Sequence, residues 1–139
     1  MKGKNCEKYS QAVYAIFRIV IGLLIATHGA QKFGLIGDGN IGGFAGMFSF
    51  PIWLAAIVAG IELIGGLLVA LGIITRIAAT LDGIVMIGAL AIVHIPKGLN
   101  PLTNGGELPL LFLVAFLVIS AYGSGKFGVE KGLMKKELV

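Results

Sequence analysis

Four apolar stretches, each close to the length needed to cross a membrane, constrain this chain more than any other feature. They extend over about residues 11–32, 52–74, 76–94 and 107–122 of 139. A hydrocarbon core about 30 Å thick requires about 20 apolar residues per helix, and isolated strands would leave backbone groups unpaired in lipid. The sequence therefore predicts an all-α fold, a transmembrane four-helix bundle that forms a single domain over residues 1–139.

The composition argues against a soluble bundle of the same length. Hydrophobic residues make up 57% of the chain and charged residues 13%, whereas soluble domains carry about 25% charged residues. No stretch has the polar outer face that a soluble helix requires. The basic residues 1–8 precede the first stretch as in a signal peptide, but that stretch is too long and contains Arg18. We therefore expect it to be retained as the first membrane span.

Most lysine and arginine residues fall on one predicted side of the membrane. They precede the first stretch, occupy the turn between the second and third, and follow the fourth: Lys2, Lys4, Lys8, Arg76, Lys126, Lys131, Lys135 and Lys136. The other side carries only Lys32 and Lys97. Because basic residues mark the cytoplasmic side, we expect a multi-pass plasma membrane protein with cytoplasmic N- and C-termini. The net charge of +4 lies at the membrane surface rather than on a soluble basic face, so nucleic acid is not expected as a partner.

Three ionisable residues fall deep within the predicted helices. At 1.5 Å per residue, Arg18 and Asp82 lie about 10 Å and 9 Å from the cytoplasmic side, and Glu62 lies near the middle of the bilayer. Charged groups at such depth usually face the bundle interior and pair. We expect Arg18 to pair with Glu62, Asp82 or both. The alternative is that Arg18 and Asp82 extend separately to the cytoplasmic headgroups.

A second polar set lies near the outer surface. His28, Lys32, His94 and Glu107 fall at similar depths, and they predict a polar pocket in which imidazole could move protons or bind a metal. The alternatives are headgroup anchors at helix ends and, for Glu107, an interaction with the helix dipole. Equal depth would also suit His28 and His94 as haem ligands. Haem is not favoured. In a regular helix, His94 lies about 120° around the helix axis from the stripe that contains Asp82, which weakens the case that the two histidines face each other.

The outer loop at residues 34–51 is rich in glycine and aromatic residues. Its apolar side chains, with those at the start of the next stretch, are Phe44, Met47, Phe48, Phe50 and Trp53. They predict a short interfacial helix or re-entrant turn that covers the pocket, and a simple aromatic belt is the alternative. Residues 37–42 formally match a dinucleotide-binding fingerprint, but the βαβ context that this fingerprint needs is missing.

The order of these residues resembles that of the DoxX-like family of small four-helix membrane proteins. The first stretch carries Arg18 and then His28-Gly29-Ala30-Gln31-Lys32, similar to the family's Arg…Gly…His-Gly-x-x-Lys pattern. The second carries Glu62, Gly65-Gly66-Leu67-Leu68, Leu71-Gly72 and Thr75-Arg76, similar to its Glu…Gly-Gly-x-Leu…Leu-Gly-x-x-Thr-Arg pattern. His94 and Gly106-Glu107 also occupy family positions, and the similarity covers residues 18–125. The resemblance implies a setting of quinone-coupled respiratory oxidoreductases, including sulfur-compound oxidation, or of redox-stress complexes.

We therefore expect a subunit or small enzyme of quinone-linked redox chemistry, with a redox protein as partner. The candidate catalytic residues are Glu62, His28 and Glu107, and the candidate ligand-binding residues are Arg18, His28, Lys32, Glu62, Asp82 and His94. No metal site is expected. Cys6 is the only cysteine, which excludes an intramolecular dithiol pair. The alternatives are a non-enzymatic assembly or anchoring partner of another complex and, third, a small-solute transporter formed by a homo-oligomer.

Overall fold

The computed structural model describes residues 2–134, and all regular structure in this range is helical. Lys135 and Lys136, which contribute to the predicted charge asymmetry, lie outside the described residues. The elements include two π-helical segments (η1 and η2) and one 3₁₀ turn (η3). In chain order they are α1 (Lys2–Lys32), α2 (Ile41–Met47), α3 (Ile52–Gly60), η1 (Ile61–Gly65), α4 (Gly66–Leu71), α5 (Thr75–Ala89), η2 (Leu90–His94), η3 (Ile95–Lys97), α6 (Pro101–Asn104), α7 (Glu107–Tyr122) and α8 (Val129–Met134).

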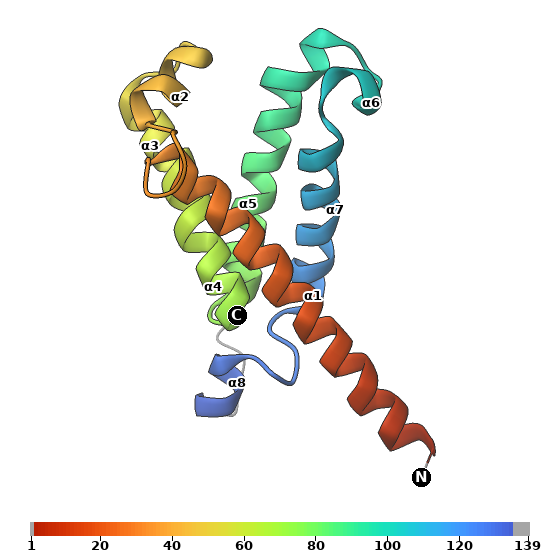
Figure 1. Ribbon diagram of the computed structural model, residues 1–139. Coiled ribbons are helices and arrows are strands. Elements are labelled where there is room, and N and C mark those ends of the chain that lie inside the picture. The colour runs from red at the N-terminus through yellow and green to blue at the C-terminus, as the bar shows by residue number, and fades with distance from the viewer. Residues whose placement is uncertain (1, 135–139) are drawn as a thin grey trace.

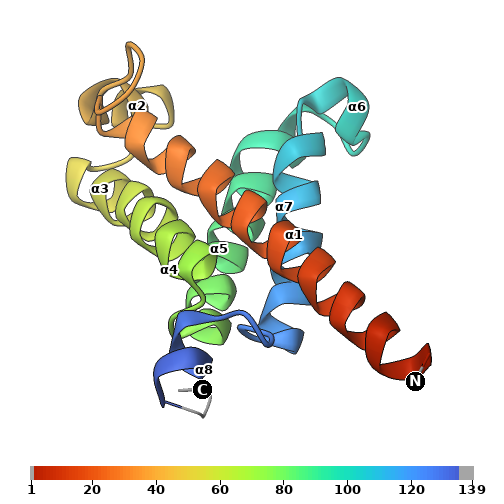
Figure 2. The same ribbon diagram turned by 60° about the horizontal axis from the view of Figure 1, so that its bottom comes forward.

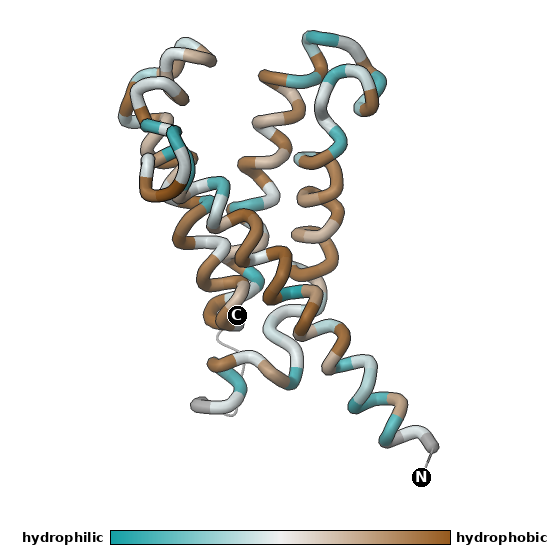
Figure 3. Tube along the Cα trace, viewed as in Figure 1, coloured by the Kyte–Doolittle hydropathy of each residue, from teal (hydrophilic) through white to brown (hydrophobic). Residues whose placement is uncertain are grey.

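Three helical runs within the described residues are long and apolar enough to cross a membrane. They are Asn5–Lys32, Ile52–Leu71 and Thr75–Lys97, and the apolar α7 is shorter at 16 residues. Hydrophobic residues line these helices, whereas polar residues gather near the N-terminus and in the loops (Figure 3). The predicted all-α membrane bundle is therefore confirmed at the level of a multi-pass helical membrane protein.

The observed helix bounds differ from the predicted ones at several ends. The first helix begins at Lys2 rather than near residue 11, because its polar first turns contain good helix formers and no Pro. The second ends at Leu71, since Gly72 adopts the left-handed conformation that closes helices. The third continues beyond His94 through η3 to Lys97. The loop after α1 does contain a short helix, α2, started by Asn40, whose side chain accepts a hydrogen bond from the Gly43 N–H.

The helices form two arms that meet at one end (Figure 1). The first arm is α1 packed across α3, η1 and α4, and the second arm is α5 packed against α7. The arms are joined where α5 contacts η1 and α4, and they diverge toward the end that carries α2 and α6 (Figure 2). The start of α1, the α4–α5 turn and α8 all lie at the opposite end (Figure 1).

Glycine allows the helices of the first arm to approach each other closely. A Cβ atom added to Gly22 of α1 would lie 2.6 Å from the Gly66 carbonyl oxygen of α4. One added to Gly29 would lie 2.4 Å from the Leu63 backbone nitrogen of η1. Small residues provide such contacts in lipid, where helix association depends on close packing rather than on water exclusion. These contacts hold Glu62, next to Leu63, against α1.

Gly22→Ala should lower the free energy of unfolding by about 1–3 kcal/mol, because the methyl group would overlap the α4 backbone. Denaturant titration in detergent micelles, followed by circular dichroism, measures this change. Gly88→Ala is the matched control, since a Cβ at Gly88 meets nothing within 4 Å, and it should keep or raise stability. Equal stability of the two variants would contradict the close helix approach.

Candidate functional site

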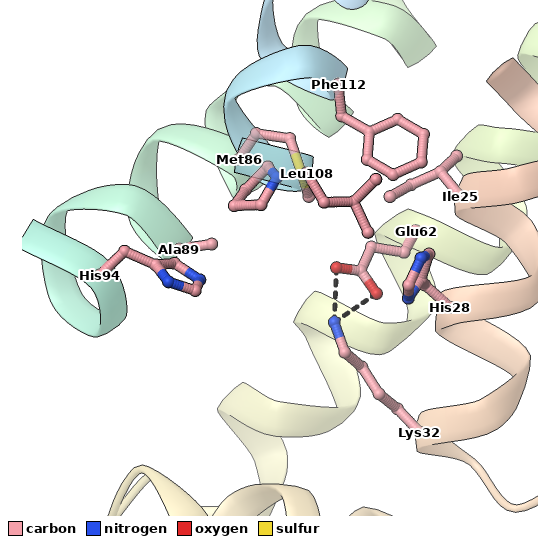
Figure 4. A pocket seen from close by; sticks show the side chains of 10 residues that line it. Ile25, His28, Lys32, Glu62, Met86, Ala89, His94, Leu108 and Phe112 are labelled. Atoms are coloured by element: carbon pink, nitrogen blue, oxygen red, sulfur yellow. Dashed lines mark hydrogen bonds and ion pairs between the residues drawn. The ribbon is translucent and has the colours of Figure 1, made fainter. Parts of the chain in front are cut away.

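A cavity of about 170 Å³ lies between the two arms, toward the end at which they diverge. Residues of α1, η1, α5, η2 and α7 line it. Six are apolar or proline, namely Ile25, Met86, Ala89, Leu108, Pro109 and Phe112, and four are polar, namely His28, Lys32, Glu62 and His94. Figure 4 shows the polar side chains on both sides of the cavity. Four of the residues predicted to form a ligand site therefore border one space.

An ion pair between Lys32 and Glu62 forms one wall of this cavity. The Lys32 Nζ lies 2.5 Å from both Glu62 carboxylate oxygens. Only 3% of the Glu62 side chain is exposed, compared with 22% of the Lys32 side chain. The Lys32 Nζ also lies 4.6 Å from the centre of the Phe44 ring of α2, which is within the range of a cation–π interaction. The ammonium group is therefore held between a buried carboxylate and an aromatic face.

Two of the polar residues come from π-helical turns. Glu62 lies in η1 and His94 lies in η2. A π turn adds a residue to one turn of a helix, so it changes the direction of the side chains that follow, and such turns are frequent at functional sites. This explains why His94 lines the same cavity as Met86, although regular helical phase separates it from the stripe of Asp82 and Met86.

The two histidines lie on different walls of the cavity (Figure 4). His28 packs edge-on against Phe112, with ring centres 5.8 Å apart. The His94 Nδ1 lies 3.0 Å from the Asn104 carbonyl oxygen. Because a carbonyl only accepts hydrogen bonds, the His94 Nδ1 is the donor in this contact, and Nε2 is left for another partner. The described residues contain no group of three His, Cys, Asp or Glu side chains suited to a metal.

Asn104 is a supporting residue that sequence reasoning missed. Its side-chain amide donates to the Gly98 carbonyl oxygen at 2.7 Å, and its side-chain oxygen accepts from the Gly106 N–H at 2.7 Å. These bonds fix the loop that presents the Asn104 backbone carbonyl to His94. The Asn104-Gly105-Gly106 sequence is typical of a turn. This turn pattern is the sequence feature that could have indicated an ordered loop beside His94.

The predicted pairing of Arg18 with Glu62 or Asp82 is wrong. Arg18 is 1% exposed, and its guanidinium donates to the Val69 carbonyl and, at 2.7 Å, to the Ala70 carbonyl. Both carbonyls lie in the last turn of α4, which ends at Leu71, where helix carbonyls lack their usual partners; the Val69 carbonyl also accepts from the Gly72 N–H at 3.2 Å. Free carbonyls at a helix C-terminus attract a cation, so Arg18 closes α4 and lies outside the cavity. Its burial also contradicts the alternative that it extends to the headgroups.

Asp82 and Glu107 also lie outside the cavity lining. Asp82 is fully buried, and its Oδ2 lies 2.7 Å from the position that a Cβ on Gly65 would take, so it rests against η1 rather than reaching the headgroups. Glu107 is exposed in the first turn of α7. The next two residues of α7, Leu108 and Pro109, line the cavity instead. Roles for Asp82 in ligand contact and for Glu107 in catalysis therefore find no support in this geometry.

Replacing Lys32 with Met or Glu62 with Gln should lower the free energy of unfolding by about 1–3 kcal/mol, because the remaining group loses its hydrogen-bond partner inside the bundle. The double variant should lose less than the sum of the two, which a double-mutant cycle in detergent micelles measures.

The Lys126–Glu7 pair offers the matched control for that cycle. Its N–O distance is also 2.5 Å, but its side chains are 55% and 57% exposed. Exposed pairs contribute little, so Lys126→Met with Glu7→Gln should give no measurable coupling. Coupling of equal size in both cycles would contradict a special role for burial at Lys32 and Glu62.

Comparisons with known proteins agree with the resemblance seen in the sequence. The DoxX family model matches residues 13–95, which is more than half of the chain. An uncharacterized protein of Haemophilus influenzae is 35% identical over 135 residues, 95% of this chain and 98% of the relative. The "Putative oxidoreductase CatD" of Bacillus subtilis is 33% identical over 120 residues, 86% of each chain. No solved structure matches significantly. The chain therefore belongs to the DoxX family of small membrane proteins.

Proposed function

We propose that the chain binds a quinone head group in the cavity between its arms and takes part in quinone-linked redox chemistry of the plasma membrane. It would act as a subunit or as a small oxidoreductase. The observation that carries this proposal is the arrangement of Lys32, Glu62, His28 and His94 around one apolar cavity within the membrane bundle. The Bacillus subtilis relative bears the name of an oxidoreductase, which supports the redox setting.

The cavity residues fit the chemistry of a quinone ring. Ile25, Met86 and Phe112 provide apolar walls, and Lys32 and His28 offer donors to carbonyl oxygens. Sites for drug-sized ligands measure about 300–1,000 Å³, so a cavity of about 170 Å³ suits a single ring whose apolar tail remains in lipid.

A quinone supplies two-electron, two-proton chemistry, and the chain's own groups would bind it and handle protons. The Glu62 carboxyl and the His94 imidazole can each hold a proton near the quinone ring. The electrons would come from a partner redox protein, because the chain has a single cysteine and so lacks a dithiol couple of its own.

We further propose four membrane spans with both termini in the cytoplasm. The apolar α7, although only 16 residues long, runs beside α5 and would form the fourth span. The start of α1, the α4–α5 turn and α8 share one end of the molecule (Figure 1), and Lys8, Arg76 and Lys126 gather there. The positive-inside tendency then assigns this end to the cytoplasm.

Quinone binding is tested with the full-length protein in lipid nanodiscs, by equilibrium dialysis against a short-tailed ubiquinone and a short-tailed menaquinone. Lys32→Met should weaken binding at least tenfold, because it removes a charged hydrogen-bond donor worth about 1.5–3 kcal/mol. Lys126→Met, at the other end of the molecule, should leave binding unchanged. If the unaltered protein binds neither quinone, the proposal fails, and a role as an assembly or anchoring partner gains support.

The orientation is tested with Cys6, the only cysteine, which is exposed near the N-terminus. A membrane-impermeant maleimide should label it in inside-out vesicles and leave it unlabelled in intact cells. The matched control is Asp38→Cys in a Cys6→Ser background, since Asp38 is exposed at the opposite end of α1. This variant should show the reverse pattern. Labelling of Cys6 in intact cells would overturn the proposed orientation.

A further inference from the structure

Asp82 is a buried carboxyl group to which the cavity site assigns no role. Its exposed fraction is 0%, and neither carboxyl oxygen has a hydrogen-bond partner among residues 2–134. It lies on α5 one turn before Met86, which lines the cavity. Buried polar groups in native proteins are nearly always satisfied, so an orphaned carboxyl between membrane helices requires an explanation.

The nearby cations are already engaged by other groups. The Arg18 guanidinium donates to carbonyls at the end of α4, and the Lys32 ammonium binds Glu62. An ionised carboxylate without a partner is very costly at such a place. Asp82 is therefore stable as the neutral acid, with its O–H available to an acceptor or an ordered water.

Asp82 and Glu62 lie close enough to influence each other. The Asp82 carboxyl rests on Gly65, where the missing side chain leaves room for it, and Gly65 is one turn from Glu62 within η1. His28 and His94 are the further titratable side chains that line the cavity with Lys32 and Glu62. Arg18 is bound to backbone carbonyls, so Lys32 is the one lysine or arginine of the described interior that pairs with either carboxyl group. Carboxyl groups in this situation titrate as a pair.

We propose that Asp82 and Glu62 hold one proton between them, and that Lys32 decides which of the two carries it. In the structure, Glu62 is the carboxylate bound to Lys32, and Asp82, which has no partner, is the acid. The net charge of the three groups is then zero.

The neutral Asp82 affects what the cavity offers to a ligand. Because Asp82 carries no charge, Lys32 stays with Glu62 at the cavity wall. Asp82 is then a positioning residue, since it acts on the ligand only through Glu62 and Lys32. This consequence rests on the proposed quinone site, whereas the shared proton itself requires no ligand.

Infrared spectroscopy of the full-length protein in nanodiscs at neutral pH, without quinone, tests the shared proton. A protonated carboxyl has a C=O stretching band that is separate from carboxylate bands and shifts in deuterated water. The wild-type protein should show a band of one buried acid, and Asp82→Asn should remove it. Glu7→Gln, at an exposed carboxyl, is the control and should leave the band unchanged.

The coupling is tested by two further variants, which remain informative if Asp82→Asn fails to fold. Glu62→Gln should remove the band, because Lys32 then takes Asp82 as its counter-ion. Lys32→Met should double the band, because neither carboxyl retains a cation. A wild-type spectrum without the band, its persistence in Asp82→Asn, or an unchanged band in Glu62→Gln or Lys32→Met would overturn the proposal. Because no quinone is present, these results are independent of the quinone-binding measurement.

Discussion

The absence of water inside a bilayer is the constraint on which the rest of this structure depends. In lipid, each polar group must find its partner within the protein. At the end that carries the start of α1 and α8, Arg18 donates to the Val69 and Ala70 carbonyls, and Arg76 donates to the Ser120 and Ala121 carbonyls. Glu130 accepts from the Ile74 N–H at 2.7 Å. Charged side chains at this end therefore complete the termini of α4, α5 and α7.

The charged groups near the cavity, Lys32 and Glu62, have a different role from those that complete helix termini. Lys32 and Glu62 satisfy each other, yet both border a cavity rather than a helix terminus. A stabilising role alone would be served as well by packed apolar side chains, because replacing a buried ion pair with well-packed apolar residues is often neutral or favourable. The position of the pair at the cavity wall, beside His28, is therefore the basis for proposing that it serves a bound molecule.

Much of the fold could be predicted from the sequence, because apolar length and composition alone decide membrane spans. The cavity residues His28, Lys32 and Glu62 could also be found, since ionisable residues in apolar helices are conspicuous. The partner of Arg18 could not be predicted, because the sequence does not show that the carbonyls at the end of α4, which stops at Leu71, lie within reach of α1. The direction of the His94 side chain could not be predicted for a similar reason. Its expected phase requires a regular helix, whereas η2 is a π turn, and the sequence of this segment does not mark it as one.

The two arms also explain why the cavity lies where it does. Gly22, Gly29 and Gly66 hold α1 tightly against η1 and α4. Buried Phe112, Phe116 and Ile119 of α7 share one core with α5 and with Ile25 of α1 and Val69 of α4, so the arms are packed together where they meet. The helices α1 and α7 themselves touch little. The cavity therefore lies where the arms diverge, and the ligand proposed for it would meet Glu62 held in place by the glycine contacts of η1 with α1.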